Sequence, residues 1–419
     1  MESEDFLQLL RDLNPQWVDD ELHLDDDLIE RDELEILQDR SGVQAIVGLR
    51  RVGKTTLLKQ YLRESAAEIG FDRTCYWSFD LAGVDVRDVI EHFAEAILRE
   101  PLTDLDGPIH LFLAEVQNRP NWSQQVKHYV DHYEDIRVTV TGSSAVNVLK
   151  GGGESLAGRL RSLHLRPFSF REYLRYHGID RNQRKLQSLV LGDRTARVQF
   201  ANYLDAGGMP EIYRSQRPVE RLEETIDLVF FRDIIELFDS ARSSVLKGMF
   251  RIFASNTGQV VNFNGLANTL DSDFRTIKKY LDYLEDAFLI DRSPLYAGSA
   301  VASARKNPKV YVCDHAYNRV YPTAVGLKSE TVAYNHLKRI EQPYYCRDPE
   351  TDIVLPESEQ LFEVKYQTNI STSDLRPLAE NADRTGFDPY VITKDTAETR
   401  TVNGQKIELV PLYAICQIV

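Results

Sequence analysis

The sequence predicts an α/β protein of several domains, in which a parallel sheet with helices on both faces comes first along the chain. Three observations carry this prediction. At 419 residues the chain is too long for one ordinary hydrophobic core. Between residues 43 and 141, short apolar runs alternate with helical patterns, which is typical of a doubly wound sheet. A glycine-containing turn separates the first apolar run from the first helix.

The elements follow from hydrophobic periodicity. Strands are expected at residues 43–47, 74–79, 109–113 and 137–141, and helices at 54–69, 86–98 and 122–133. The glycines at 151–153 break this alternation and an arginine-rich stretch follows them. We therefore expect an acidic segment at 1–40, a nucleotide-binding core at 41–167, a helical region at 168–240, a helix-turn-helix region at 241–300 and a further α/β domain at 301–419.

Composition excludes several classes of protein. The hydrophobic fraction is 42% and charged residues make up 27%, as in a globular protein. No apolar run approaches the roughly 18 residues that span a bilayer, and the acidic start is unlike a signal peptide. Four scattered cysteines indicate neither a disulfide framework nor a zinc ribbon. We expect a cytoplasmic protein that does not associate with a membrane.

The acidic net charge of −15 is unevenly distributed. Residues 1–40 hold fifteen acidic residues and three arginines, so this segment alone carries −12 of that charge. Residues 242–310 reverse the sign, with ten Lys/Arg against six Asp/Glu. The global acidity therefore leaves open a contact with DNA made by this later segment.

Residues 48–55 read GLRRVGKT and match the pattern of a phosphate-binding loop between a strand and a helix. Backbone amides and the helix N-terminus would bind phosphates, Lys54 would reach the outer phosphates, and Thr55 would ligate Mg²⁺. This predicts ATP with Mg²⁺ as cofactor. The expected nucleotide contacts are Gly48, Arg50, Arg51, Val52, Gly53, Lys54, Thr55 and Thr56.

Further nucleotide-site residues are expected at strand ends. Glu115 follows the third predicted strand, where it could orient the attacking water, and we expect that strand to neighbour the phosphate-loop strand. Ala114 stands where an aspartate would hold the magnesium shell, which places metal affinity and turnover in question. Ser143 ends the fourth strand and could contact the γ-phosphate. Arg159 and Arg161 are candidate phosphate sensors or arginine fingers, with ordinary surface arginines as the equal alternative for either one.

The chain resembles a prokaryotic family of AAA-type P-loop ATPases in GLRRVGKTTLLKQYL, LFLAEVQNRPNW, TGSSA and GRLRSLHLRPFSFREYL. Weaker likenesses are NPQW, YLDAGGMPEIY, FFRDIIELF and FEVKY, which occur in the family's order. The resemblance implies an AAA-type core, a helical lid, a winged helix and a C-terminal domain similar to restriction endonucleases. It implies ATP binding and a role around DNA or protein partners. AAA-type ATPases commonly form rings, so a homo-oligomer stays open.

Residues 266–290 have the pattern of a helix-turn-helix followed by a strand. Arg275, Lys278 and Lys279 fall on or near the outer face of its second helix, where basic residues could contact DNA phosphates in a major groove. The alternative is a module that serves only for packing.

Two predicted strands, at 351–355 and 360–366, form a hairpin across a four-residue turn. If Leu355 pairs with Gln360, Asp352 lies opposite Glu363, about 5 Å away between Cβ atoms. Lys365 faces the same side. Carboxylates so close predict a divalent cation between them, and Glu330 could add a ligand.

This D-x10-E-x-K pattern resembles the PD-(D/E)xK nucleases, which implies metal-dependent DNA cleavage by Asp352, Glu363 and Lys365. An exposed, salt-bridged hairpin would look the same. Two hypotheses follow: an ATPase that controls a DNA-cleaving half, or a nucleotide-dependent switch whose C-terminal half binds a partner without cleavage. His128 and His132 are spaced like zinc ligands, but no third ligand is evident and a solvated helix face is preferred.

Overall fold

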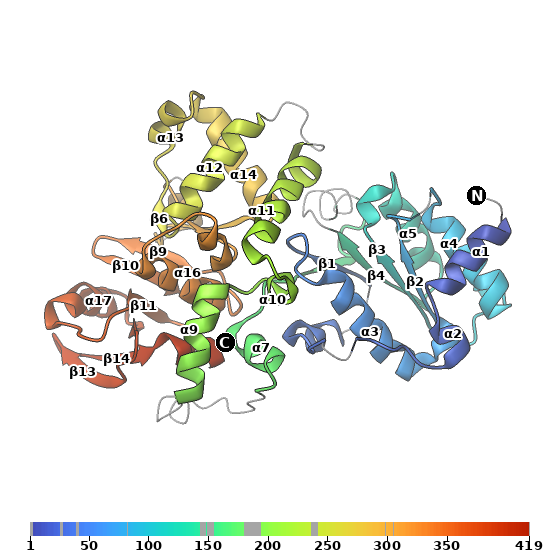
Figure 1. The fold of residues 1–419 in the computed structure, drawn as a ribbon, viewed down its shortest axis with the longest axis horizontal. Coiled ribbons are helices and arrows are strands. Elements are labelled where there is room, and N and C mark those ends of the chain that lie inside the picture. The colour runs from blue at the N-terminus through green and yellow to red at the C-terminus, as the bar shows by residue number, and fades with distance from the viewer. Residues whose placement is uncertain are drawn as a thin grey trace. The chain divides into compact units, whose positions relative to one another are not determined.

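The structure is a computed structural model that describes residues 3–25, 28–38, 42–81, 83–142, 148, 155–179, 194–235, 242–297, 299–304 and 306–418. The chain forms two compact units, Met1–Arg166 and Pro167–Val419, and each is described by itself (Figure 1). None of the helices in these ranges is long and apolar enough to cross a membrane.

The first unit is built on a five-stranded parallel sheet with the order β2-β3-β4-β1-β5. Its strands are β1 (Val43–Val47), β2 (Thr74–Ser78), β3 (Ile109–Ala114), β4 (Ile136–Gly142) and β5 (Leu160–His164). The first four lie where the sequence predicted them. The arginine-rich stretch contains the fifth, which was missed because LRSLH on an edge strand is partly exposed and lacks an apolar run.

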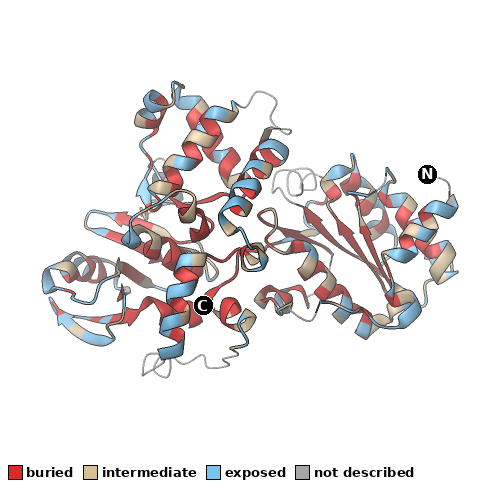
Figure 2. Cartoon of the chain, viewed as in Figure 1, coloured by how far each residue is buried: buried red, intermediate tan, exposed pale blue. Residues whose placement is uncertain are grey.

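Helices pack against both faces of this sheet, and strands β1 to β4 are mostly buried (Figure 2). They are α3 (Lys54–Ile69), α4 (Val86–Phe93) and α5 (Trp122–His132), with a π-helical turn η3 (Ala94–Leu98) and short 3-10 turns η2 (Phe71–Arg73), η4 (Leu102–Asp104) and η5 (Val116–Asn118). In α3, Leu57, Leu58, Tyr61 and Leu62 are buried at helical spacing, as predicted.

The acidic N-terminal segment belongs to this unit and is not a separate region ending at residue 40, as the sequence suggested. It forms α1 (Ser3–Asp12), α2 (Gln16–Asp19) and η1 (Asp32–Gln38). Asn14 satisfies the exposed edge of β2, accepting from the amide of Tyr76 at 2.7 Å and donating to its carbonyl at 2.9 Å. Trp17 donates to the carbonyl of Thr74 at 2.7 Å. The segment therefore covers an open sheet edge.

The second unit begins with helices, as predicted for residues 168–240. They are α7 (Phe170–Tyr176), α9 (Arg194–Ala206), α10 (Pro210–Arg214), α11 (Pro218–Leu228) and the π-helical η7 (Val229–Ile235). There follow α12 (Ser243–Ser255), β6 (Gln259–Val260), α13 (Phe263–Thr269), α14 (Phe274–Asp286) and β7 (Ile290–Ser293). A third strand, β8 (Lys309–Val312), completes an antiparallel sheet with the order β6-β8-β7. This module thus extends beyond the predicted end at residue 300.

A six-stranded mixed sheet completes the second unit, with the order β13-β14-β12-β11-β10-β9. Its strands are β9 (Tyr344–Arg347), β10 (Glu350–Leu355), β11 (Gln360–Lys365), β12 (Asp388–Thr393), β13 (Glu398–Val402) and β14 (Gln405–Pro411). The helical elements are α15 (Ala300–Ala304), η8 (His315–Arg319), α16 (Val325–Leu337), α17 (Thr372–Thr385) and α18 (Leu412–Ile418). One apolar cluster joins α9, α16 and α18 to the sheet, and another joins α17 to it.

Candidate functional sites

The predicted phosphate loop joins β1 to α3 and has a backbone that requires its glycines. Gly53 has a φ of +102°, in the region that favours glycine. A Cβ on Gly48 would lie 2.4 Å from the carbonyl oxygen of Leu165, so only glycine fits there. Arg51 has a φ of +66°, and the side chains of Arg50 and Arg51 are partly exposed on the loop.

Lys54 opens α3 and folds its side chain back across this loop. Its ammonium is buried and donates to the carbonyls of Gly48 at 2.9 Å and Leu49 at 3.0 Å. Phosphate oxygens would be stronger partners than these carbonyls because they are charged. Thr55 is exposed and Thr56 half-buried at the first turn of α3, next to the lysine. The loop therefore presents the groups that a triphosphate with Mg²⁺ needs.

Arg31 is a residue of this site that the sequence did not indicate. It is buried, and its guanidinium donates to the carbonyl of Val52 within the loop at 3.1 Å and to the carbonyl of Arg166 at 2.7 Å. Glu33 lies 3.5 Å from the guanidinium. Arg31 fixes the loop to the end of the strand segment that follows β5. One of three arginines in an acidic segment gave no signal of this role.

Glu115 follows directly after Ala114 at the end of β3, as predicted. Its carboxylate accepts a hydrogen bond from the side-chain amide of Gln117 at 2.5 Å. Its backbone amide lies 3.4 Å from the hydroxyl of Thr141, a buried residue on β4. Gln117 therefore holds the half-exposed carboxylate, and Thr141 contacts the backbone of the same residue, at the sheet edge to which the phosphate loop also belongs.

The strand that carries Glu115 does not neighbour the phosphate-loop strand, contrary to the prediction. β4 lies between β3 and β1. Strands are about 4.8 Å apart, so Glu115 stands about 10 Å from β1 across the sheet.

Two further predictions concerned the phosphates. Ser143 lies outside the described residues. Arg159 precedes β5, and its carbonyl accepts from the amide of Val43 at the amino edge of the parallel sheet. The phosphate loop is at the carboxyl edge, about 17 Å away at about 3.3 Å per residue. Arg159 instead forms an ion pair with Asp131 at 2.6 Å. Within the first unit, the Arg159 side chain is therefore paired with Asp131 rather than placed at the phosphate loop, and its role as a phosphate sensor stays a prediction.

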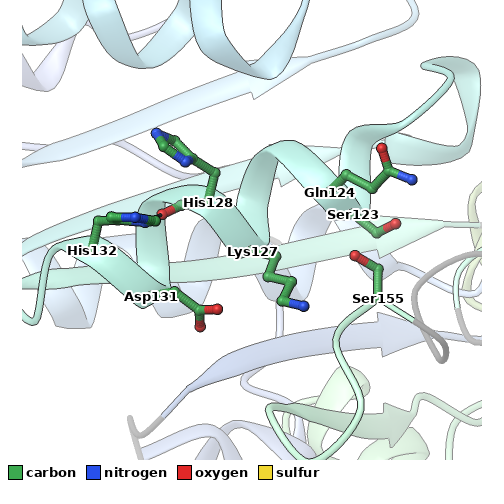
Figure 3. Close-up of a pocket in the computed structure, with 7 residues that line it drawn as sticks. All are labelled: Ser123, Gln124, Lys127, His128, Asp131, His132 and Ser155. Carbon is green, nitrogen blue, oxygen red and sulfur yellow. Dashed lines mark hydrogen bonds between the residues drawn. The ribbon is translucent and has the colours of Figure 1, made fainter.

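A shallow cavity of about 550 Å³ lies along α5 and includes the two spaced histidines (Figure 3). The rings of His128 and His132 lie 4.5 Å apart, and the Nδ1 of His132 bonds the carbonyl of His128 at 2.7 Å. In Figure 3, Lys127 extends on the side of α5 toward Ser155, while His128 points away. Across the described ranges, no three His, Cys, Asp or Glu side chains are grouped to hold a metal ion. The histidines remain a solvated helix face.

The basic residues predicted to contact DNA lie on one exposed face of α14. Arg275, Lys278 and Lys279 are exposed, and the Lys279 ammonium lies 5.4 Å from the ring centre of Tyr283. The helix begins at a sharp cap, where Asp273 accepts from two backbone amides of the first turn. Burial of Ile277, Leu281 and Leu284 turns the opposite face inward.

The predicted hairpin forms in the predicted register, in which Leu355 pairs with Gln360. The paired residues are Ile353 with Phe362, Val354 with Leu361, and Leu355 with Gln360. Near Asp352 a side-chain hydrogen bond joins the two strands, since the Oδ2 of Asp352 accepts from the backbone amide of Val364 at 3.0 Å. Asp352 and Glu363 are both buried.

An unpredicted ammonium lies among these carboxylates. Lys309 on β8 is 4% exposed, and its Nζ lies 2.9 Å from Asp352 and 3.1 Å from Glu330 on α16. The hydroxyl of Tyr311, two residues along β8, donates to Glu330 at 2.7 Å. The exposed carboxylate of Glu350 lies 3.9 Å from the same ammonium. Lys309 is the first residue of the strand KVYV, and a lysine at a strand start does not by itself indicate a buried charge.

Only one of the two carboxylate oxygens of Glu363 has a polar partner among the described residues. Its Oε1 pairs with the ammonium of Lys365 at 2.7 Å, while its buried Oε2 has no hydrogen-bond partner among the described residues. Burial and the charge of Asp352 raise the pKa of Glu363 to about 8. Burial, and then Asp352, also raise the pKa of Glu330 to about 7. Burial opposes the charge on Lys309, but Asp352 and Glu330 outweigh it and raise its pKa.

The metal site predicted at Glu330, Asp352 and Glu363 requires correction. The structure brings the three residues into one buried cluster, but these carboxylates are not arranged as a metal-binding group within the described ranges. The physical reason is that ammonium groups already face these carboxylates. Lys309 lies between Glu330 and Asp352, and Lys365 pairs with Glu363, so the repulsion between Asp352 and Glu363 that predicted a cation is offset without one.

Comparisons with known proteins agree with the first unit. Residues 40–174 match the family described as an AAA domain, and residues 197–330 match DUF8612, a domain of unknown function. An uncharacterised Haemophilus influenzae protein is 27% identical over 314 residues, 72% of this chain and 74% of that protein. An uncharacterised protein from Methanocaldococcus jannaschii is 25% identical over 365 residues, which cover 82% of this chain and 78% of that protein.

Among solved structures, a Walker-type ATPase of Pyrococcus abyssi has a TM-score of 0.41 at 14% identity, covering 71% of this chain and 97% of that one. The family match confirms the predicted AAA-type ATPase domain. The match over residues 197–330 identifies neither a winged helix nor a nuclease.

Proposed function

We propose that the protein binds ATP with Mg²⁺ in its first unit and hydrolyses it, and that the nucleotide controls a second unit that contacts DNA. The observation that carries the ATPase part is the buried ammonium of Lys54, which donates to backbone carbonyls of the loop. The loop requires glycine at positions 48 and 53, where a side chain would clash or strain the backbone. In this proposal Lys54 binds the outer phosphates, Thr55 ligates Mg²⁺, and Glu115 orients water.

Two substitutions separate binding from hydrolysis. Lys54→Ala should weaken binding of a fluorescent ATP analogue roughly tenfold or more, because a hydrogen bond to a charged group contributes about 1.5–3 kcal/mol. Glu115→Gln should retain binding and lose phosphate release. Arg63→Ala, on the exposed face of α3, is the matched control for removal of a positive charge. Normal hydrolysis by both test variants would overturn the assignment.

DNA contact is proposed for α14 and its module. The order of helices α12, α13 and α14 with the antiparallel sheet β6-β8-β7 supports the proposal that this module is a winged helix. The exposed cations Arg275, Lys278 and Lys279 give its outer face the charge that phosphates require. We propose that α14 lies in the major groove of a duplex.

The salt dependence of binding tests this contact. The double variant Lys278→Ala/Lys279→Ala should bind duplex DNA more weakly. It should also lower the slope of log affinity against log salt by about 2, because each lysine would otherwise neutralise one phosphate. Lys394→Ala/Lys406→Ala removes two exposed lysines elsewhere in the unit and is the control. Equal affinities and slopes in the two double variants would contradict the proposal.

For the C-terminal hairpin, the position of Lys309 favours the alternative in which this half binds a partner without cutting it. Carboxylates already neutralised by an ammonium attract a divalent cation less strongly. Plasmid DNA with Mg²⁺ or Mn²⁺, with and without ATP, should stay intact with the wild-type protein as with Lys365→Ala. Cleavage by the wild type alone would restore the nuclease hypothesis.

A further inference from the structure

The second unit contains a polar cavity of about 600 Å³ that the proposed duplex contact does not use. It opens where the chain after β7 passes alongside β9. Leu295 pairs with Tyr345 there, the amide of Tyr345 donates to the carbonyl of Pro294 at 3.0 Å, and the amide of Tyr296 donates to the carbonyl of Tyr345 at 2.7 Å. The Tyr345 hydroxyl donates to the carbonyl of Asn307 at 2.6 Å. The floor of the cavity is therefore firmly hydrogen-bonded.

The cavity is positively charged. Lys306, Arg347 and Arg384 line it against one carboxylate, that of Asp348. Lys306 and Arg347 are exposed, and neither side chain forms a hydrogen bond or ion pair with the described residues. Their charges are thus available to an anionic ligand.

Arg384 differs from these two cations because its guanidinium is fixed. It donates to the carbonyl of Asp348 at 2.8 Å and to the side chain of Asn381 at 2.6 Å. A positioned guanidinium suits phosphate, since its planar donors match phosphate oxygens and little entropy is lost on binding.

An aromatic side chain accompanies the cations. Tyr296 lines the cavity, is half-buried, and packs with ring centres 6.1 Å from Tyr344 and 6.0 Å from Phe387. A ring supported in this way can stack against a base. In a duplex the faces of each base are covered by its neighbours, whereas an unpaired base is free to stack.

We propose that this cavity binds single-stranded nucleic acid, with Lys306, Arg347 and Arg384 on the phosphates and Tyr296 on a base. The inference rests on the proposed contact of this unit with DNA and adds a second, separate strand-binding site. The cavity adjoins the buried carboxylates, because the Lys309 ammonium lies 5.8 Å from the ring centre of Tyr345. A strand held here would lie beside that cluster.

Fluorescence anisotropy of the full chain with a labelled oligo-dT of about 20 nucleotides and with a mixed-sequence duplex tests the proposal. Lys306→Glu/Arg347→Glu should weaken single-strand binding at least about tenfold and lower its salt slope by about 1–2, with duplex affinity nearly unchanged. The α14 double alanine variant should show the reverse pattern. Lys394→Glu/Lys406→Glu controls for the change in net charge.

Stacking is tested separately at the tyrosine. Tyr296→Phe should bind oligo-dT like the wild type, and Tyr296→Ala should bind several-fold more weakly. The proposal is overturned if the wild type does not bind oligo-dT, or if the cavity and control charge variants bind it equally. A wild type that binds oligo-dT but does not bind the duplex would refute the α14 contact and leave this cavity standing. Thermal unfolding of each variant confirms that it is folded.

Discussion

Lys309 and Tyr311 occupy alternate positions on β8, and both direct polar groups at Glu330. The ammonium also reaches Asp352. A buried lysine is stable only when its charge is paired, and here two carboxylates pair it. Removing it would leave those carboxylates buried without a counter-ion, which typically costs about 3–5 kcal/mol. Lys309 is thus part of the structure of this cluster rather than a surface charge.

Proton uptake by the cluster gives a pH-dependent stability. Glu363 has its pKa raised from 4.5 to about 8, so the folded state holds a proton that the unfolded state releases between these values. Its contribution is present below pH 4.5 and is lost as pH rises toward 8, at up to about 1.4 kcal/mol per pH unit. Glu363→Gln should therefore flatten the fall in unfolding free energy between about pH 5 and 8.

Urea unfolding of the wild type and Glu363→Gln at about pH 5, 6.5 and 8 measures this difference. Comparing the two proteins is necessary because burial lowers the pKa of His336 to about 3, which gives an opposite trend below pH 6.5. That trend is common to both proteins and cancels. Parallel curves over the whole range would show that Glu363 is ionised in the folded state.

Ala114 offers a prediction at the nucleotide site. It ends β3, is 1% exposed, and stands where the phosphate-loop hypothesis expects an aspartate to hold the magnesium shell. Ala114→Asp should raise the ATPase rate at limiting Mg²⁺ by about tenfold, since a charged hydrogen-bond acceptor contributes about 1.5–3 kcal/mol. In the control variant Ala114→Asn, the new side chain has nearly the same volume as aspartate but no charge, so the ATPase rate should not rise. Equal rates for the two variants would indicate that this position does not act on the metal.

At the scale of elements, the turn between α12 and β6 closes the carboxylate cluster. Gly258 has a φ of +81°, and a Cβ there would lie 3.0 Å from Oε1 of Glu330 and 3.1 Å from the Tyr311 ring. Gly404, in the β13–β14 turn, has a φ of +83° and nothing within 4 Å. Both Ala variants incur the backbone strain, about 1–2 kcal/mol. Gly258→Ala should lose roughly 1 kcal/mol more, from overpacking.

Chemical denaturation compares the unfolding free energies of Gly258→Ala and Gly404→Ala. Both variants carry the same backbone strain, so the difference between them measures the contact of the new Cβ with Glu330 and Tyr311. A Gly258→Ala variant no less stable than Gly404→Ala would mean that the turn moves away and does not constrain Glu330. The raised pKa of Glu330 should fall if the turn opens, since burial is its main cause.

Elements could be predicted where their determinants are local. The β10–β11 register followed from the four-residue turn, because one assumed pair fixes every other pair across a hairpin. β5 could not be predicted, because an edge strand needs no apolar run. Lys309 was out of reach for another reason: it meets Glu330 and Asp352 only after three elements assemble, and its strand pairs in a different sheet from β10.

At the scale of the molecule, the sequence indicated the phosphate loop, the parallel sheet and the later modules in their order along the chain. It did not indicate their grouping. Five predicted segments become two compact units, because the acidic segment packs on the sheet edge of the first and all elements after residue 166 belong to the second. The boundary of a compact unit depends on which surfaces of its elements pack together. Sequence composition indicates which residues are polar, but not which surfaces meet.

This grouping predicts two separable unfolding transitions. ATP should raise only the transition of the first unit, because a ligand stabilises the state that binds it, by about 2.7 kcal/mol at a roughly hundredfold excess over Kd. For a unit of this size the shift is roughly 5–10 °C. Differential scanning calorimetry of the full chain with ATP and Mg²⁺ measures it, and Lys54→Ala should abolish the shift. Changing the pH from about 5 to 8 should instead move the second transition through Glu363. A single transition that shifts as a whole with ATP would show that the two units unfold as one cooperative body, with the nucleotide energy shared between them.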